Sequence, residues 1–400
     1  MDRISMGLTV IESHPVQYHA PVFRHLQSHF GIPVTAIYGS DSSVRGGVDA
    51  EFGTKVAWDT DLLSGYSAVF LSEGRDEPVS YGLGNALSSA APGPAMVLGY
   101  GSKFDARALA CAILSRRPIL LRAETTDHAR ARSPLKRFVR DLSLRVAYDR
   151  CAQLLYIGQR SLQHYQRLGC GAEKLQFSPY CIDTTAFEYQ ESDRATLRNA
   201  ARLDLGASTS SIVMLFSGKL SYRKGPDLLL EAVSQFGRDY AARVVIVFLG
   251  SGQMAEDLQA TASDLGLRNP VFAGFQNQRH LSRFYHAADV LVLPSRRSET
   301  WGLVVNEAMH HGLPCVVSSA VGCAVDLVKP GQTGEIFDAG SSSALRAALQ
   351  RIEPILGRGE TREACRAQVS GYSVAEAAKG IAIAYRRVSH TGIYRTEGLS

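Results

Sequence analysis

Short apolar runs alternate with amphipathic segments along the first half of this chain of 400 residues. Runs of four to eight apolar residues are typical of strands in a parallel sheet that is buried on both faces. Between the runs, apolar residues recur at helical spacing near Pro21, over DARALACAILS and from about Ser161. The runs that predict strands are GLTVIES, PVTAIY, AMVLGY, PILLRAE, QLLYIG and LQFSPYCID.

The second half repeats this alternation. Helical patterns follow Gly225, begin at about Met254, and recur at 280–287 and 302–311. The apolar runs between them are SIVMLFSG, RVVIVFLG, PVFAGF, DVLVLPS and PCVVSS. Strands that alternate with helices in two halves predict an α/β fold of two doubly wound, Rossmann-like domains, with ligands at the carboxyl ends of the strands.

A polar stretch separates the two halves. We expect an N-terminal domain over residues 1–190, a linker over 191–210 and a C-terminal domain over 211–372. A last helical pattern at about 373–390 could pack back onto the first domain.

Composition narrows the class of protein. No apolar run approaches the ~18 residues that a membrane-spanning helix needs, and the first run reads as a strand rather than a signal peptide. The seven cysteines include no C-x-x-C pair, so we expect reduced thiols that pack in the core. These features are typical of a cytoplasmic globular protein.

The positive charge is concentrated in one segment. The formal net charge is only +5, whereas residues 116–150 hold ten Lys or Arg against four Asp or Glu. Within this segment, PLKRFVRDLSLRVAYDR is amphipathic at helical spacing. Such a segment suits peripheral contact with an anionic membrane surface or an acidic acceptor, and a solvated helix face is the alternative. We expect no nucleic-acid partner.

The stretch SGKLSYRKGPDLLLEA follows the first strand of the second half. Gly218 permits a tight turn, and Lys219 and Lys224 lie on either side of a short loop. Both ammonium groups could therefore reach one diphosphate, because lysine binds phosphate as a point charge. The alternative is a pair of solvated surface lysines.

The stretch FLGSGQMA also follows a strand. Gly250, Gly252 and Ala255 match the dinucleotide-binding pattern G-x-G-x-x-A, so a nicotinamide enzyme is a rival reading. That reading requires an acidic residue at the end of the next strand, and PVFAGFQNQ has none. A glycine turn that contacts a phosphate or a sugar through backbone amides satisfies the pattern without such an acid.

Two carboxylates, Glu299 and Glu307, lie on either side of a predicted helix start. The turn from Thr300 through Trp301 and Gly302 to Leu303 would offer backbone amides and a helix dipole to a phosphate. A carboxylate on each side suits the hydroxylated rings of a nucleotide-sugar. A metal held by the E-x-x-H pattern from Glu307 is the weaker alternative, since no second half of such a site occurs.

Taken together, SGKLSYRKGPDLLLEA, FLGSG, DVLVLPS and SETWGLVVNEAMHHGLPCVVSSAVGCAVDLVKPGQTGEIF resemble the family-4 retaining glycosyltransferases (glycosyl transferases group 1) of the GT-B fold. The resemblance covers almost all of the second half. It implies two domains that face each other across a cleft, and transfer of a hexose-type unit from a nucleotide-diphosphate-sugar to a glycan, lipid-linked or small-molecule acceptor. UDP- or GDP-sugar is the expected donor, no metal or cofactor is implied, and polysaccharide biosynthesis is the setting by family habit.

The resemblance also implies roles for single residues. Glu299 would contact the donor sugar, Glu307 would accept from the ribose hydroxyls, and Lys219 and Lys224 would hold the diphosphate and stabilise its charge. A GT-B epimerase and a noncatalytic nucleotide-sugar binding protein are the alternatives.

The first half resembles the family more loosely. In ESHPVQYHAP the acceptor-side candidates are His14, Gln17 and His19, and the alternative is a histidine that caps the helix at Pro21. In RAETTDHAR either Glu124 or His128 could take the place of the histidine that is frequent in this region of the family.

One further motif points to different chemistry. Asp59 and Asp61 mimic the metal-binding DxD of the other main glycosyltransferase fold. They do not follow a long apolar strand, and we expect no metal there.

Overall fold

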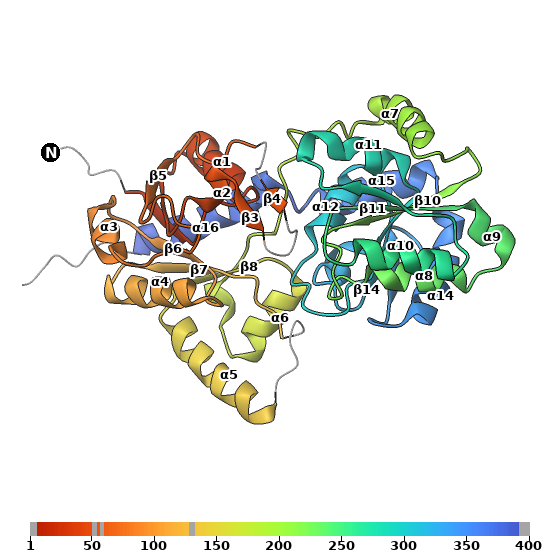
Figure 1. Ribbon diagram of the computed structural model, residues 1–400. Helices are drawn as coiled ribbons and strands as arrows, with labels where there is room; N and C mark the ends of the chain where they lie inside the picture. The colour runs from red at the N-terminus through yellow and green to blue at the C-terminus, as the bar shows by residue number, and fades with distance from the viewer. Residues whose placement is uncertain (1–5, 50–53, 57–59, 128–132, 392–400) are drawn as a thin grey trace, which may run out of the picture.

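The computed structural model describes residues 6–49, 54–56, 60–127 and 133–391, which form two α/β lobes side by side (Figure 1). The first lobe contains a seven-stranded sheet in the order β5-β2-β1-β6-β7-β8-β9, and the second contains a six-stranded sheet in the order β12-β11-β10-β13-β14-β15. Neighbouring strands in both sheets are parallel. The predicted class, two doubly wound α/β domains, is confirmed.

The strands of the first sheet are β1 (Leu8–Glu12), β2 (Val34–Tyr38), β5 (Ser67–Phe70), β6 (Ala95–Leu98), β7 (Ile119–Arg122), β8 (Gln153–Tyr156) and β9 (Leu175–Phe177). The strands of the second sheet are β10 (Ile212–Ser217), β11 (Val244–Leu249), β12 (Val271–Gly274), β13 (Val290–Leu293), β14 (Cys315–Ser318) and β15 (Gly334–Phe337). A separate antiparallel pair consists of β3 (Gly47–Asp49) and β4 (Thr54–Val56).

The helices of the first lobe are α1 (Ala20–Phe30), α2 (Ser42–Arg45), α3 (Leu83–Ser89), α4 (Lys103–Leu114), α5 (Pro134–Asp149), α6 (Gln159–Arg167) and the 3-10 turn η1 (Ala172–Lys174). Those that follow are α7 (Glu191–Asp204), α8 (Pro226–Ser234), α9 (Arg238–Arg243), α10 (Ala255–Asp264), η2 (Gln278–His280), α11 (Leu281–Ala287), α12 (Leu303–His310), α13 (Ala324–Leu327), α14 (Ser342–Ile352), η3 (Glu353–Ile355), α15 (Gly359–Val369) and α16 (Val374–Thr391).

Two edge strands escaped the sequence pattern. The side chains of β5 alternate between exposed and half-buried, so its run SAVF lacks the continuous burial of a central strand. Strand β15 includes the acidic Glu335, whose carboxylate pairs with Arg351 at 2.8 Å. The pattern found all the central strands and the half-buried edge strands β9 and β12, but missed the other two edge strands.

Most of the segment 191–210, which the sequence predicts as a linker, is the helix α7. Helix α7 packs against α11, and Arg198 and Arg202 both pair with Asp289, at 2.5 and 3.1 Å. The segment reads as polar because its arginines bond to this carboxylate and to nearby carbonyl oxygens. Its arginines thus dock the helix, while other polar residues such as Glu191, Ser192 and Thr196 are exposed to solvent.

The last helix, α16, returns to the first lobe and packs against α1. The Tyr385 hydroxyl donates to the Met6 carbonyl at 3.0 Å. Gly380 lies against β9 so closely that a Cβ there would be 2.0 Å from the Phe177 oxygen. The chain crosses between the lobes twice. The two crossing segments lie side by side, and an isolated parallel β-bridge joins Ile182 of one to Ser373 of the other.

Helix α6 forms much of the direct contact between the lobes. Its first backbone amide, on Gln159, donates to Asp326 of the second lobe at 2.9 Å. The Arg160 guanidinium donates to the carbonyls of Ser319 and Val321, both at 2.9 Å. The lobes are thereby held with the carboxyl ends of both sheets toward the cleft.

In the part of the chain that the structure describes, no helix is long and apolar enough to cross a membrane. All seven cysteines are free thiols, five of them buried.

Candidate active site

Loops at the carboxyl ends of strands line the cleft from both sides. In the second lobe, Gly218 follows β10, Gly250 follows β11, and the loop with Glu299 follows β13. In the first lobe, His14 and His19 follow β1 and Glu124 follows β7. This is the edge at which doubly wound sheets bind ligands.

Glu299 is held by three side chains of the second lobe. Its Oε2 lies 2.5 Å from Lys224 Nζ, 3.5 Å from an Arg223 nitrogen and 3.0 Å from Ser295 Oγ. The Lys224 and Glu299 side chains are only 13% and 11% exposed, so water screens this ion pair weakly. Of the predicted basic pair, Lys224 therefore lies against the carboxylate, and Lys219 lies on the same loop after β10.

The path of the Glu299 loop is fixed by backbone contacts with the turn after β14. The Glu299 carbonyl accepts from the Gly322 amide at 2.9 Å. A Cβ at Gly322 would lie 1.8 Å from the Thr300 oxygen, so only glycine permits this approach. Gly302, with φ +100°, then starts α12.

Glu307 is buried inside the second lobe at the first turns of α12. Its Oε2 accepts from the Tyr285 hydroxyl at 2.5 Å. Burial raises the pKa of Glu307 to about 7, although the Tyr285 hydrogen bond opposes this rise. Burial raises the pKa of Tyr18, a residue of the first lobe, and the Glu307 charge raises it further.

Two predicted donor contacts beside Glu299 differ in what they present to the cleft. Thr300 Oγ1 donates to Glu124 Oε2 across the lobes at 2.5 Å. The Trp301 side chain, in contrast, is buried, and its indole nitrogen donates to Asn306 at 2.9 Å. The ring packs against Gly158 between the lobes, and the expected donor contact of Trp301, through the backbone amides of its turn, stays a prediction. Leu303 is half-buried at the first position of α12.

Gly218, Gly250 and Gly252 bring two loops into backbone contact. The Gly218 amide donates to the Leu249 carbonyl and the Leu220 amide donates to the Ser251 carbonyl, both at 2.9 Å. A Cβ at Gly250 would be 2.1 Å from the Gly218 oxygen, and one at Gly252 would be 2.4 Å from the Leu220 oxygen. These contacts explain the G-x-G pattern without a dinucleotide.

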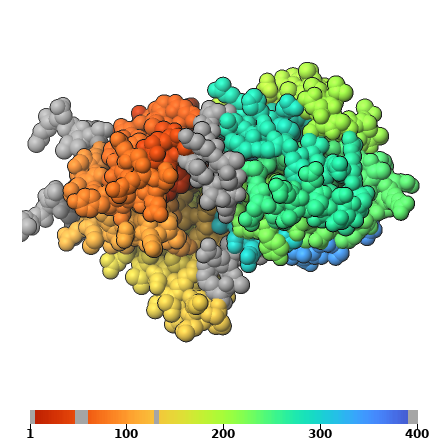
Figure 2. Space-filling model, viewed as in Figure 1, coloured from red at the N-terminus to blue at the C-terminus, as the bar shows by residue number. Residues whose placement is uncertain are grey.

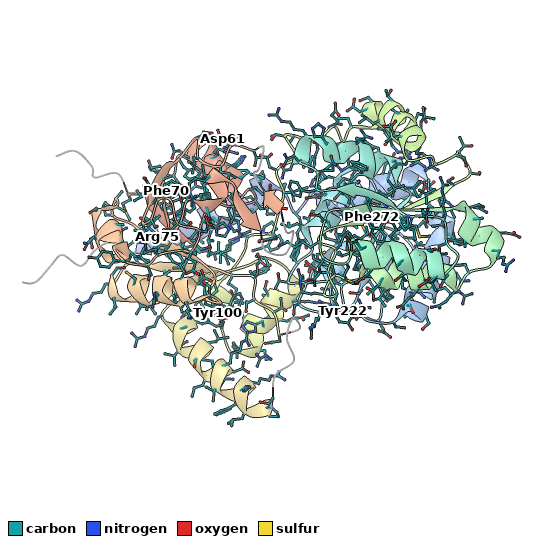
Figure 3. All side chains as sticks on the ribbon, viewed as in Figure 1. Asp61, Phe70, Arg75, Tyr100, Tyr222 and Phe272 are labelled. Atoms are coloured by element: carbon teal, nitrogen blue, oxygen red, sulfur yellow. The ribbon has the colours of Figure 1, made fainter. Side chains whose placement is uncertain are left out.

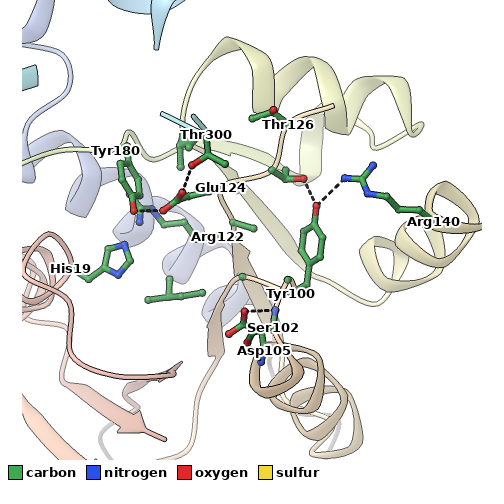
Figure 4. A pocket seen from close by; sticks show the side chains of 16 residues that line it. His19, Tyr100, Ser102, Asp105, Arg122, Glu124, Thr126, Arg140, Tyr180 and Thr300 are labelled. Carbon is green, nitrogen blue, oxygen red and sulfur yellow. Dashed lines mark hydrogen bonds between the residues drawn. The ribbon is translucent and has the colours of Figure 1, made fainter. Parts of the chain in front are cut away.

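The first lobe supplies a cavity of about 460 Å³ that opens beside Thr300 (Figure 4). Glu124 lies in it between Thr300 and Tyr180, whose hydroxyl also donates to the Glu124 carboxylate. The charged or polar side chains around the cavity are His19, Tyr100, Ser102, Asp105, Arg122, Glu124, Thr125, Thr126, Arg140, Tyr180 and Thr300. The cavity can accept a hydroxylated or anionic molecule.

His19 faces this cavity, and its ring is bonded to a buried acid. Its Nδ1 lies 2.6 Å from Glu12 Oε1, and its Nε2 is buried without a hydrogen-bond partner among the described residues. His19 stands at the start of α1 but makes no side-chain cap, so the helix-capping alternative does not describe it. A carboxylate–histidine pair with one open ring nitrogen can bond a ligand hydroxyl.

The other acceptor-side candidates lie apart from this cavity. His14 Nδ1 is 2.9 Å from Ser13 Oγ. Gln17 is buried, and its Oε1 accepts from Gln278 of the second lobe at 3.4 Å. His128 lies outside the described residues.

The metal alternatives find no structural support in the described part of the chain, where no group of three His, Cys, Asp or Glu could hold an ion. Asp61 caps a turn, because its Oδ1 accepts from the amides of Leu63 and Ser64 at 3.0 Å. Figure 3 shows Asp61 at the top of the first lobe and Tyr100 well below it. Asp59 lies outside the described residues.

Sequence reasoning missed several residues that shape the site. Arg223 and Ser295 contact Glu299, Tyr285 contacts Glu307, and Tyr180 contacts Glu124. Arg223 had a usable signal, since it directly precedes Lys224 in SYRKG. Tyr285 and Tyr180 gave no such signal, because in the sequence they look like ordinary core residues, of a helix and of the end of a strand.

Comparison with known proteins identifies the second lobe. Residues 198–369 match the family model described as "Glycosyl transferases group 1". These residues form a glycosyl transferases group 1 domain. The group 1 domain contains Glu299, Glu307, Lys219 and Lys224, and the resemblance noted from the sequence is thus confirmed at this level.

Curated relatives share this part of the chain. A D-inositol 3-phosphate glycosyltransferase of Acidothermus cellulolyticus is 31% identical over 228 residues, which are 55% of this chain and 49% of the relative. One of Segniliparus rotundus is 30% identical over 270 residues, which are 65% of this chain and 57% of the relative. The chain thus covers less than two thirds of the length of either relative.

Solved structures match over nearly the whole chain. HepE of Anabaena, solved with UDP-glucose, has a TM-score of 0.67 at 17% identity, with 96% of this chain and 99% of that chain covered. Sucrose-phosphate synthase of Thermosynechococcus elongatus has a TM-score of 0.70 at 17% identity, with 97% and 100% covered. At this identity the likeness shows the fold alone, and that fold is GT-B.

Proposed function

We propose that this protein is a retaining, metal-independent glycosyltransferase that moves a sugar from a nucleotide-diphosphate-sugar to an acceptor hydroxyl. The observation that carries the proposal is the site around Glu299 in a group 1 domain, where a carboxylate, Lys224 and Arg223 meet at the cleft. HepE of Anabaena was solved with UDP-glucose, so UDP-glucose is the first donor to test. Cytoplasmic surface-polysaccharide assembly is the proposed setting.

Each residue has a role in this reaction. Glu307 accepts from the ribose hydroxyls of the donor, and Glu299 orients the sugar. Lys219 and Lys224 stabilise the charge that develops on the diphosphate as its bond to the sugar breaks. The acceptor hydroxyl forms the new bond on the face that the diphosphate leaves, and its proton passes to the departing phosphate. Closure of the lobes on the donor would exclude water.

The first-lobe cavity is the proposed acceptor side. It lies beside Thr300; the His19 Nε2 there has no hydrogen-bond partner among the described residues, and the Glu124 carboxylate accepts from Thr300 and Tyr180. A carboxylate and an imidazole suit an acceptor that offers several hydroxyl groups. This arrangement fits a glycan, a lipid-linked sugar or a small polyol.

A donor-consumption assay tests the proposal. Release of nucleoside diphosphate is followed for UDP-, GDP-, ADP- and TDP-sugars in EDTA, with glycan, lipid-linked and polyol acceptors. We expect one donor to be consumed faster when an acceptor is added, and the product to keep the anomeric configuration of the donor. Conversion of a donor to its epimer without an acceptor, or binding with no turnover for any acceptor, would overturn the proposal. Glu299→Gln should reduce turnover while the protein stays folded.

A further inference from the structure

Helix α5 turns an apolar face to solvent. Five of its large apolar side chains are more than half exposed, at Leu135 (73%), Phe138 (67%), Val139 (55%), Leu142 (54%) and Val146 (57%). Their spacing of three and four residues places them on one face of the helix. Of the thirteen exposed large apolar residues in the described chain, no other helix or strand supplies more than one. A contiguous exposed face of this kind marks a contact surface.

The opposite face holds α5 firmly on the first lobe. Leu144 and Tyr148 are buried in the core. Arg167 of α6 also bonds Asp141 of α5 at 2.5 Å and Asp127 at 2.6 Å. The apolar face therefore points outward from an anchored helix. In Figures 1 and 2, α5 forms the yellow protrusion at the lower edge of the molecule.

Positive charge flanks the apolar face. Lys136, Arg145 and Arg150 are exposed on and next to α5, and Asp149 is the exposed acid among them. An amphipathic helix with apolar residues on one face and Lys or Arg at its margins is suited to the headgroup region of an anionic bilayer. A second copy of the chain fits less well, because a two-fold contact would bring these cations against each other.

The apolar helix and the first-lobe cavity are neighbours. Arg140, on the inner side of α5, lines the cavity and donates to the Tyr100 hydroxyl at 3.3 Å. A surface that binds α5 would therefore lie close to the mouth of the cavity.

We propose that α5 docks the protein on an anionic lipid bilayer, with Phe138, Leu142 and their apolar neighbours among the headgroups. The protein then works at a lipid surface, and a molecule that enters the cavity can come from that surface. This inference does not depend on the proposed sugar transfer, because docking needs neither donor nor acceptor.

Vesicle co-sedimentation tests it on the full chain without any sugar. Vesicles contain phosphatidylcholine alone or phosphatidylcholine with phosphatidylglycerol. We expect binding to the anionic vesicles only, and a loss of about tenfold or more for the double variant Phe138→Ser, Leu142→Ser. Lys136→Gln with Arg145→Gln should weaken binding as well. Leu203→Ser, at a leucine of α7 that is 80% exposed, is the control and should bind like the wild type.

Three results would overturn the proposal. The wild type fails to bind anionic vesicles, or the Phe138→Ser, Leu142→Ser variant binds as well as the wild type. The third such result is a wild-type dimer in light scattering, with only the Phe138→Ser, Leu142→Ser variant monomeric. A second copy of the chain would then cover α5. Circular dichroism checks the fold, and the exposed positions of both side chains predict an unchanged melting temperature.

Discussion

The Lys224 ammonium lies 2.5 Å from a Glu299 carboxylate oxygen and joins two loops that are 75 residues apart in the sequence. The loops follow β10 and β13, which are neighbours in the sheet, so the sheet order itself brings the two charges together. A nucleotide-sugar offers a diphosphate to the cation and hydroxyl groups to the carboxylate. Donor binding in the proposed reaction therefore exchanges this ion pair for two contacts with substrate.

Removal of the Lys224 charge should affect turnover far more than folding. We expect Lys224→Met to lower the rate of nucleoside diphosphate release by roughly 100-fold, because the charge on the leaving group loses its partner. Lys329→Met, at an exposed lysine of the same lobe, is the matched control and should keep the wild-type rate. Equal rates for Lys224→Met and the wild type would remove Lys224 from the proposed mechanism.

Glu307 should make the stability of the protein depend on pH. Its pKa is about 7 in the folded chain and near 4.5 when unfolded, so between these values the folded state keeps a proton that the unfolded state has lost. Stability should therefore fall as pH rises toward 7. Urea unfolding measures the free energy of unfolding of both proteins. Relative to the wild type, that of Glu307→Gln should rise by on the order of 3 kcal/mol between about pH 5 and about pH 8.

The exposed acid variant Glu363→Gln is the control for this measurement. A constant difference for Glu307→Gln would show that Glu307 is ionised in the folded protein throughout.

Glycine in the G-x-G turn should be required for stability rather than for dinucleotide binding. A Cβ at Gly252 would lie 2.4 Å from the Leu220 carbonyl oxygen, so we expect Gly252→Ala to cost roughly 2–4 kcal/mol. Gly266 also has positive φ but open space around it, and Gly266→Ala should cost only about 1 kcal/mol. Chemical unfolding of both variants makes the comparison. Nicotinamide dinucleotide binding by the wild type that Gly252→Ala abolishes would favour the rival reading instead.

The sequence pattern predicted the central strands. These strands are buried on both faces, so each appears in the sequence as a nearly continuous apolar run such as RVVIVFLG. It could not predict α7, whose arginines look solvated until Asp289 is placed beside them. Polarity alone does not separate a linker from a helix that docks through ion pairs.

The site was predictable where it lies within one loop or helix and unpredictable where it depends on the opposite lobe. The positions of Lys224 and Glu307 follow from local strand and helix boundaries. The contacts of Glu299 depend on Gly322, and those of Thr300 depend on Glu124, more than 170 residues earlier. The place of the Trp301 ring, beside Gly158 of the first lobe, likewise depends on the opposite lobe.

A thermal-shift panel of UDP-, GDP-, ADP- and TDP-sugars, each with EDTA, tests the central claim most directly. The account predicts that at least one nucleotide-sugar raises the melting temperature by roughly 3–8 °C at a saturating concentration. The rise should persist in EDTA and shrink in Glu307→Gln. Stabilisation by none of the four classes would contradict the nucleotide-sugar site, and stabilisation that disappears with EDTA would contradict its independence of metal.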